Sequence, residues 1–142
     1  MMARALAVCR VALGALFIWA AVTKLPDMTA FAQDVANYRV IPAALVPLLA
    51  AAVVGIELLA GIALVIGVMD RPAAAVLAVL LAAFTALLAQ ALLRGIDLRC
   101  GCFGGDERAS WWTVVRDLVM LAAAAAVARG PLPARTNVTN PA

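Results

Sequence analysis

Histidine is absent from the 142-residue sequence, and charged residues are scarce. Charged residues make up 13% of the chain and hydrophobic residues 67%, whereas a soluble domain is about a quarter charged and about half apolar. A chain of this length builds one modest core, which cannot hide so many apolar side chains from water. The composition therefore excludes a soluble enzyme and a disordered segment, and the lack of a basic cluster excludes a nucleic-acid binder. Without histidine, histidine-based catalysis and histidine-ligated metals are excluded as well.

Cysteine is also rare, with only Cys9, Cys100 and Cys102 in the chain. Three cysteines are too few for a disulfide scaffold, but two of them suffice for one reactive pair. Cys9 precedes the other two by most of the chain and lies at the start of the first apolar segment. We therefore expect it to be a buried small apolar residue rather than a member of that pair.

Long uncharged runs dominate what remains, and the mean hydropathy is +1.06. A helix needs about 20 residues to cross the hydrocarbon core of a bilayer. Four apolar segments approach or exceed this length, at residues 5–22, 43–69, 73–93 and 111–127. The sequence therefore predicts an all-α integral membrane bundle of four transmembrane helices. We expect one membrane domain over residues 1–129 and a flexible tail over residues 130–142.

The segment between the first two predicted spans has a helical pattern of its own. Phe31, Val35 and Tyr38 recur at i, i+4 and i+7 within residues 27–41, and polar side chains occupy the opposite face. This pattern predicts a short amphipathic helix at the membrane surface. Aromatic residues are enriched at membrane interfaces, so we expect Tyr38 and the tryptophans to act as anchors, namely Trp19, Trp111 and Trp112.

The positively charged residues around the first span favour one orientation in the membrane. Arg4 and Arg10 lie at its start and Lys24 at its end. By the positive-inside rule, the N-terminus is then cytoplasmic. Four crossings return the C-terminus to the same side and place the loop with Cys100 and Cys102 outside the cytoplasm, where disulfides form.

The strongest local motif is Cys100-Gly101-Cys102. Cysteines spaced i, i+2 can close a small disulfide ring, because Gly101 removes the side-chain clash of such a tight turn. A small ring is strained, and strained disulfides are easily reduced. Arg99 would favour a thiolate next to it. The motif is consistent with a thiol–disulfide redox centre, with a structural disulfide, or with metal binding by two thiolates.

Glu57 is the second candidate, since it lies near the middle of the second predicted span. A charge at the bilayer centre costs several kcal/mol unless it is paired, protonated or hydrated. Two interpretations stay open for Glu57. It either donates and accepts protons in a polar pocket, or it forms one half of a structural ion pair.

Several polar residues could accompany Glu57. Lys24 ends the first span, Gln90 lies about one turn inside the third, and Arg116 lies inside the fourth with Asp117 next to it. We expect Arg116 to reach toward Glu57. All of these residues fall in the half of the bundle that faces the cysteine loop, so they predict one pocket on that side rather than a channel.

The sequence resembles the MauE family of methylamine-utilisation membrane proteins, which is related to the DoxX-like four-helix proteins. The resemblance spans nearly the whole chain. It rests on Lys24-Leu25-Pro26, Phe31, Tyr38, Pro42, Glu57-Leu58-Leu59-Ala60-Gly61, Cys100-Gly101-Cys102-Phe103-Gly104 and Arg116-Asp117. It implies a four-helix protein of the bacterial inner membrane that is associated with the maturation of exported redox enzymes. It also implies that Cys100 and Cys102 are the functional pair.

The leading hypothesis is a membrane thiol–disulfide redox component. Cys100 and Cys102 would exchange electrons with an extracytoplasmic thioredoxin-like partner or a maturing redox enzyme, with a quinone as a further electron acceptor. Lys24, Glu57, Gln90, Arg116 and Asp117 would line the pocket and handle protons. The alternatives are a non-catalytic assembly subunit with a static Cys100–Cys102 disulfide and a membrane protein that binds small molecules or metals. No sequence feature specifies an oligomeric state.

Overall fold

The computed structural model describes residues 1–99 and 108–130, and in these ranges the regular elements are helical. Four helices are long and apolar enough to cross a membrane, which confirms the predicted all-α membrane bundle. They are α1 (Met2–Lys24), α3 (Val46–Ile66), α4 (Asp70–Leu93) and α5 (Trp111–Arg129). The short helix α2 (Met28–Asn37) follows α1, and two 3₁₀ turns, Leu25–Asp27 and Ala43–Leu45, flank it.

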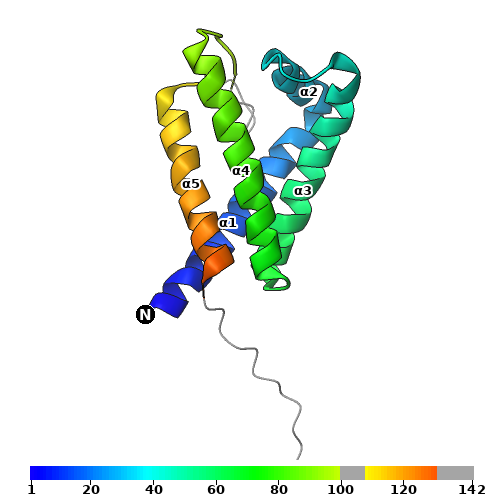
Figure 1. Cartoon of the computed structure of the whole chain (residues 1–142). Helices are drawn as coiled ribbons and strands as arrows, with labels where there is room; N and C mark the ends of the chain where they lie inside the picture. Colours follow the sequence, from blue (N-terminus) through cyan, green and yellow to red (C-terminus); the bar gives the residue numbers. More distant parts are fainter. Residues whose placement is uncertain (100–107, 131–142) are drawn as a thin grey trace, which may run out of the picture.

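Local sequence signals account for where the helices begin and end. The Asp27 side chain caps α2 by accepting a hydrogen bond from the Ala30 amide at 2.9 Å, and Ser110 caps α5 through the Thr113 amide. Gly67 ends α3 in the left-handed conformation, with φ of 76°. The next helix starts at Asp70, three residues earlier than the predicted third span, so α3 and α4 form a tight antiparallel hairpin (Figure 1).

The long helices form two pairs. The most extensive contacts join α1 to α3 and α4 to α5. In the first pair, Gly14 and Gly61 face each other so closely that a methyl group on Gly14 would lie 2.7 Å from the Gly61 carbonyl oxygen. Small residues permit such close approach of membrane helices. Gly61 therefore lies at a close contact between α1 and α3, whereas Gly55 on the same helix has open space around it.

The bundle has two unlike ends (Figure 1). The loop end carries α2, the last turn of α1, the last turn of α4 and the start of α5. The terminal end carries the N-terminus, the turn between α3 and α4, and the last turn of α5. A compact apolar cluster fills the terminal half and includes Leu13, Leu64, Leu77 and Val127, all at most 3% exposed.

Exposed apolar side chains cover the outside of the bundle, as expected of a surface that faces lipid. The three tryptophans expected to act as anchors are all exposed. Tyr38 is different, because it is 2% exposed and packs with Leu88 and Val114, so the prediction of an interfacial Tyr38 is wrong. Cys9 was expected to be buried and is instead exposed on α1.

Candidate functional site

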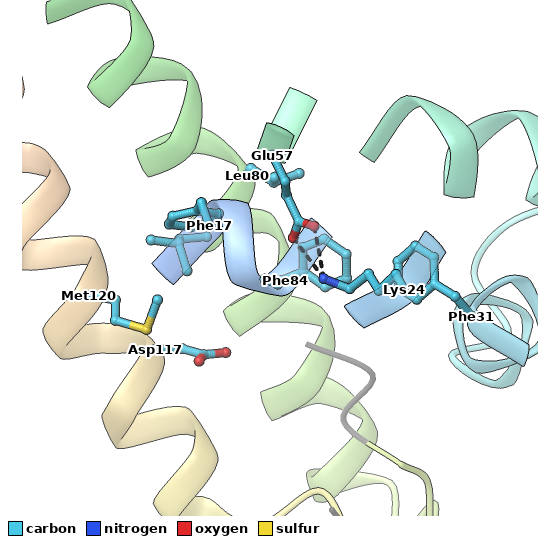
Figure 2. A pocket seen from close by; sticks show the side chains of 10 residues that line it. Phe17, Lys24, Phe31, Glu57, Leu80, Phe84, Asp117 and Met120 are labelled. Carbon is cyan, nitrogen blue, oxygen red and sulfur yellow. Dashed lines mark hydrogen bonds and ion pairs between the residues drawn. The ribbon is translucent and has the colours of Figure 1, made fainter. Parts of the chain in front are cut away.

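A buried ion pair joins α1 to α3 in the loop half of the bundle. The Lys24 Nζ donates hydrogen bonds to both carboxylate oxygens of Glu57, at 2.8 Å to Oε2 and 3.1 Å to Oε1. The two side chains are 2% and 6% exposed. The ammonium also lies 5.2 Å from the centre of the Phe31 ring, within cation–π range. Lys24, Glu57 and Phe31 thus form one charged cluster among α1, α2 and α3 (Figure 2).

Helical periodicity explains why these charges are buried. In α1 the buried residues Leu13, Phe17 and Ala20 fall on one stripe, and Lys24 continues it at i+11 from Leu13. In α3 Glu57 is in phase with Val53 and Gly61 on the buried stripe of that helix. The sequence therefore turns both charges inward, where an unpaired charge is costly, and each neutralises the other.

A cavity of about 30 Å³ adjoins this ion pair. Its walls come from all five helices, namely Phe17, Ala20, Lys24, Phe31, Glu57, Leu80, Leu81, Phe84, Asp117 and Met120. Most of the wall is apolar, and the charged atoms come from three residues. Figure 2 shows the Asp117 carboxylate on α5 pointing into the space that Lys24 and Glu57 border from the other side.

Asp117 and Arg116 are neighbours in sequence, but Asp117 is buried and Arg116 is partly exposed. Asp117 is 2% exposed and in phase with the buried residues Thr113 and Ala124. The Arg116 Nε lies 3.5 Å from the Asp117 Oδ1, and its side chain is 25% exposed. The prediction that Arg116 reaches Glu57 is therefore wrong, because Lys24 holds Glu57 and the periodicity of α5 turns Asp117, not Arg116, toward the cavity.

Gln90 does not line the cavity. It lies near the end of α4, where its side-chain oxygen accepts a hydrogen bond from the Arg94 Nη1 at 3.1 Å. The structure thus brings Lys24, Glu57 and Asp117 together around one space and places Gln90 outside it.

Cys100 and Cys102 lie outside the described residues, but both flanks of their segment are described. Leu98 is buried against α4 and accepts a hydrogen bond from the Ala109 amide at 2.9 Å, which brings the two flanks together. Arg99 forms an isolated antiparallel bridge with Arg108. The Arg99 Nε lies 3.6 Å from the Asp34 Oδ1 on α2. The base of the segment is therefore anchored at the loop end of the bundle.

Two contributors to this region were not identified from the sequence. The sequence pattern put Phe31 on the apolar face of the helix between the first two spans and gave neither Phe31 nor Asp34 a role at the site. The structure places Phe31 in the cavity wall and Asp34 one turn later against Arg99. A signal was available for Lys24 as the partner of Glu57, because it continues the buried stripe of α1. Asp34 has no comparable signal, since its partner is distant in sequence.

The arrangement can hold water and an ion pair. A water molecule needs about 10–15 Å³ of such volume and two to four polar partners, so the cavity has room for about two. At about 30 Å³ the cavity is small in this conformation. Within residues 1–99 and 108–130, no group of three histidine, cysteine or acidic residues is arranged to hold a metal ion.

The fold and the site together define a multi-pass membrane protein, built as a four-helix bundle with a buried Lys–Glu pair beside a small cavity. The family model described as "Methylamine utilisation protein MauE" matches residues 2–130, and the chain belongs to this family. The methylamine utilization protein MauE of Paracoccus denitrificans is 39% identical over 128 residues, which cover 88% of this chain and 68% of that protein. No solved structure matches the chain.

Proposed function

We propose that this protein is a bacterial inner-membrane component for thiol–disulfide exchange, which acts through Cys100 and Cys102 in the maturation of an exported redox protein. The related protein is named for methylamine utilisation, which gives the process in which we place this chain. The reactive cysteines would lie outside the cytoplasm and the N-terminus and C-terminus inside it. The protein partner would be a thioredoxin-like protein or the maturing enzyme itself.

The observation that carries the proposal is the double role of α2. Phe31 on this helix closes the cavity next to Lys24, and Asp34, three residues later, holds Arg99. Residues three apart lie on the same face of a helix. Arg99 immediately precedes Cys100, so one short helix links the buried polar cluster to the base of the cysteine segment.

The chemistry is a balanced exchange between a dithiol and a disulfide. A thiolate of one cysteine attacks a partner disulfide and forms a mixed disulfide, and the second cysteine resolves it. Two electrons pass from Cys100 and Cys102 to the partner, which leaves with two thiols. The protons move from the attacking thiols to the departing ones. A nearby arginine favours the thiolate that starts the reaction, and Arg99 immediately precedes Cys100 in the sequence.

The buried cluster would assist by accepting and returning protons at the same end of the bundle. Lys24, Glu57 and Asp117 are the candidates that the geometry favours, because all three border the cavity. Gln90 and Arg116 would act only indirectly, since neither lines the cavity. The proposal assigns no step to a quinone.

Thiol trapping in membranes tests the exchange. Membranes are equilibrated in graded redox buffers and labelled with a maleimide that changes the mobility of the protein. The proposal expects a Cys100–Cys102 couple that titrates near cellular potentials. A Cys102→Ser variant should accumulate a mixed disulfide through Cys100. A pair that stays oxidised under strong reductant, with no adduct in the variant, would instead identify the alternative assembly subunit with a static disulfide.

Reporter fusions test the orientation separately. Alkaline phosphatase is active outside the cytoplasm, so a fusion after Arg129 should be inactive and a fusion within the loop between α4 and α5 should be active. The reverse pattern would place the cysteines in the reducing cytoplasm and contradict the proposed function.

A further inference from the structure

The two ends of the bundle differ in their balance of charge. Among the residues that the structure describes, the terminal end carries one acid, Asp70, against Arg4, Arg10, Arg71 and Arg129. Toward the loop end, by contrast, acids are almost as numerous as lysines and arginines. An excess of positive charge therefore collects at the terminal end, where it attracts anions.

The acid at the terminal end is already neutralised. The Arg10 Nη1 lies 3.1 Å from both carboxylate oxygens of Asp70. A side chain at Gly67 would collide with the Arg10 guanidinium, so glycine at this turn leaves room for the ion pair. Arg71 follows Asp70 directly in the sequence. Because Asp70 is paired with Arg10, its charge does little to repel an anion beside Arg71.

Arg71 is held against the end of α5. Its Nη2 donates hydrogen bonds to the backbone carbonyls of Gly130 at 2.9 Å and Arg129 at 3.4 Å. A guanidinium has five N–H donors in a fixed fork, so donors on Nε and Nη1 remain for an anion. The ion pairs formed among residues 1–99 and 108–130 include neither Arg71 nor Arg129. Two exposed arginines, one from α4 and one from α5, therefore share this corner of the bundle.

Helix length places both arginines at the level of lipid headgroups. The 24 residues of α4 extend over about 36 Å, which exceeds the roughly 30 Å of a hydrocarbon core. Arg71 lies in the first turn of α4, and Arg129 is the last residue of α5. Both side chains therefore lie where a bilayer presents its phosphates.

The helix surface below each arginine is apolar and exposed. Val79, about two turns from Arg71 on α4, is 70% exposed, and Leu118, about three turns from Arg129 on α5, is 48% exposed. A phospholipid can place its phosphate against the arginines and its acyl chains against these side chains. A free phosphate would use the charges alone, so the arrangement favours a lipid.

We propose that Arg71 and Arg129 bind the phosphate of an anionic phospholipid where α4 meets the end of α5. The planar fork of arginine matches the geometry of a phosphate, and basic sites between membrane helices bind anionic headgroups. The lipid bridges the start of α4 to the end of α5 and supports the contact that Arg71 already makes there. This inference concerns the terminal end and holds whatever chemistry Cys100 and Cys102 carry out.

Native mass spectrometry tests the site. The full chain is stripped of lipid in detergent and titrated with phosphatidylglycerol or phosphatidylcholine. The first phosphatidylglycerol should bind more tightly than phosphatidylcholine. An arginine near an anionic lipid contributes about fivefold to affinity, so Arg71→Gln and Arg129→Gln should each weaken phosphatidylglycerol binding about fivefold. Unchanged affinity in both variants would overturn the proposal.

Arg129→Gln is the cleaner of the two variants. The hydrogen bonds of Arg71 go to backbone carbonyls, so this substitution leaves them in place and keeps the test valid if Arg71→Gln does not fold. The matched control is Arg94→Gln, which removes an exposed arginine that follows α4 at the loop end. Its affinity for phosphatidylglycerol should be unchanged. An equal loss in Arg94→Gln would show that net charge alone attracts the lipid, which would contradict a site at Arg71 and Arg129.

Thermal midpoints distinguish the source of the phosphate. Phosphatidylglycerol should raise the midpoint of the natural protein, and the rise should fall by at least half in Arg129→Gln. Inorganic phosphate at the same concentration and ionic strength should raise neither midpoint, because it lacks the acyl chains. An equal rise with inorganic phosphate would identify a site for a free anion and overturn the lipid assignment. An equal rise with polyglutamate would overturn it in favour of an acidic protein segment.

Discussion

The two ends of the bundle each contain an ion pair between distant helices, but the two pairs have different surroundings. At the terminal end, Arg10 contacts Asp70 at 3.1 Å, with side chains 20% and 11% exposed. At the loop end, Lys24 and Glu57 are 2% and 6% exposed and adjoin a cavity. The first pair lies where a helix hairpin meets the edge of the bundle, and the second lies among apolar side chains.

The two halves of the bundle also differ in how closely their helices pack. The terminal half brings the backbones of α1 and α3 into contact through Gly14 and Gly61 and fills the remaining space with an apolar cluster. Arg71 also donates to the Gly130 carbonyl at 2.9 Å, which caps the end of α5. The loop half instead leaves open volume next to its charges. This contrast indicates that the terminal half is closely packed, while the loop half combines buried charges with open volume.

Removal of the buried lysine should have the largest effect. Lys24→Met leaves the Glu57 carboxylate buried without its cation, and breaking a buried pair in this way costs about 3–5 kcal/mol. We expect a loss of that size in the free energy of unfolding, measured by denaturant titration in mixed micelles. Lys24→Met combined with Glu57→Gln should recover most of it, because no charge is then left unpaired. If the double variant recovers nothing, the pair is not what stabilises this half.

Disruption of the tight contact between α1 and α3 should have the next largest effect. Gly61→Ala places a methyl group 2.9 Å from the Gly14 carbonyl oxygen, so α1 and α3 must separate. Overpacking of this kind costs about 1–3 kcal/mol. The matched control is Gly55→Ala on the same helix, where nothing lies within 4 Å, and its stability should not fall. Equal losses of stability in the two variants would show that the close contact at Gly61 is not what makes the substitution costly.

The partly exposed ion pair at the terminal end should matter less. Arg10→Met removes a pair that water and lipid headgroups can partly replace, and such pairs contribute up to about 1 kcal/mol. The same micelle titration should show a loss of about this size or smaller. A loss as large as that of Lys24→Met would mean that the two ends do not differ in the way their burial indicates.

Substitution of the exposed cysteine should have the smallest effect. Cys9 lies on the outer surface of α1, and surface substitutions change stability by about 0.5 kcal/mol or less. Cys9→Ser should leave both the unfolding curve and the redox titration of the other cysteines unchanged. A shifted redox titration would show that Cys9 takes part in exchange, contrary to its position at the opposite end of α1 from the cysteine loop.

Much of the fold could be predicted because each span is a local property of the sequence. Apolar length identified the four long helices, and the i, i+4, i+7 pattern identified α2. The cavity residues were predicted less well. Glu57, Lys24 and Asp117 were all singled out, but Glu57 was matched with Arg116, because the length of a side chain was considered before the phase of its helix.

The burial of Tyr38 and the exposure of Cys9 also could not be predicted from the sequence. Both were assigned from the usual behaviour of their residue types, and both have the opposite exposure in the structure. Tyr38 is covered because the chain after α4 and the start of α5 fold over it, with Leu98 and Val114 in contact. Cys9 lies one turn before the buried Leu13, and it is uncovered because the start of α1 extends beyond the other helices (Figure 1). Neither result follows from the residues on either side of these positions.

The sequence by itself determined which segments cross the membrane and which charges occur within them, because apolar length and helical phase are properties of single segments. Only the tertiary structure decided which charge meets which. That choice depends on how closely Gly14 and Gly61 bring two helices together and on how the second helix pair leans against them. These distances come from packing between segments far apart in the chain, and they placed Lys24 on Glu57 and Asp117 across the cavity from both.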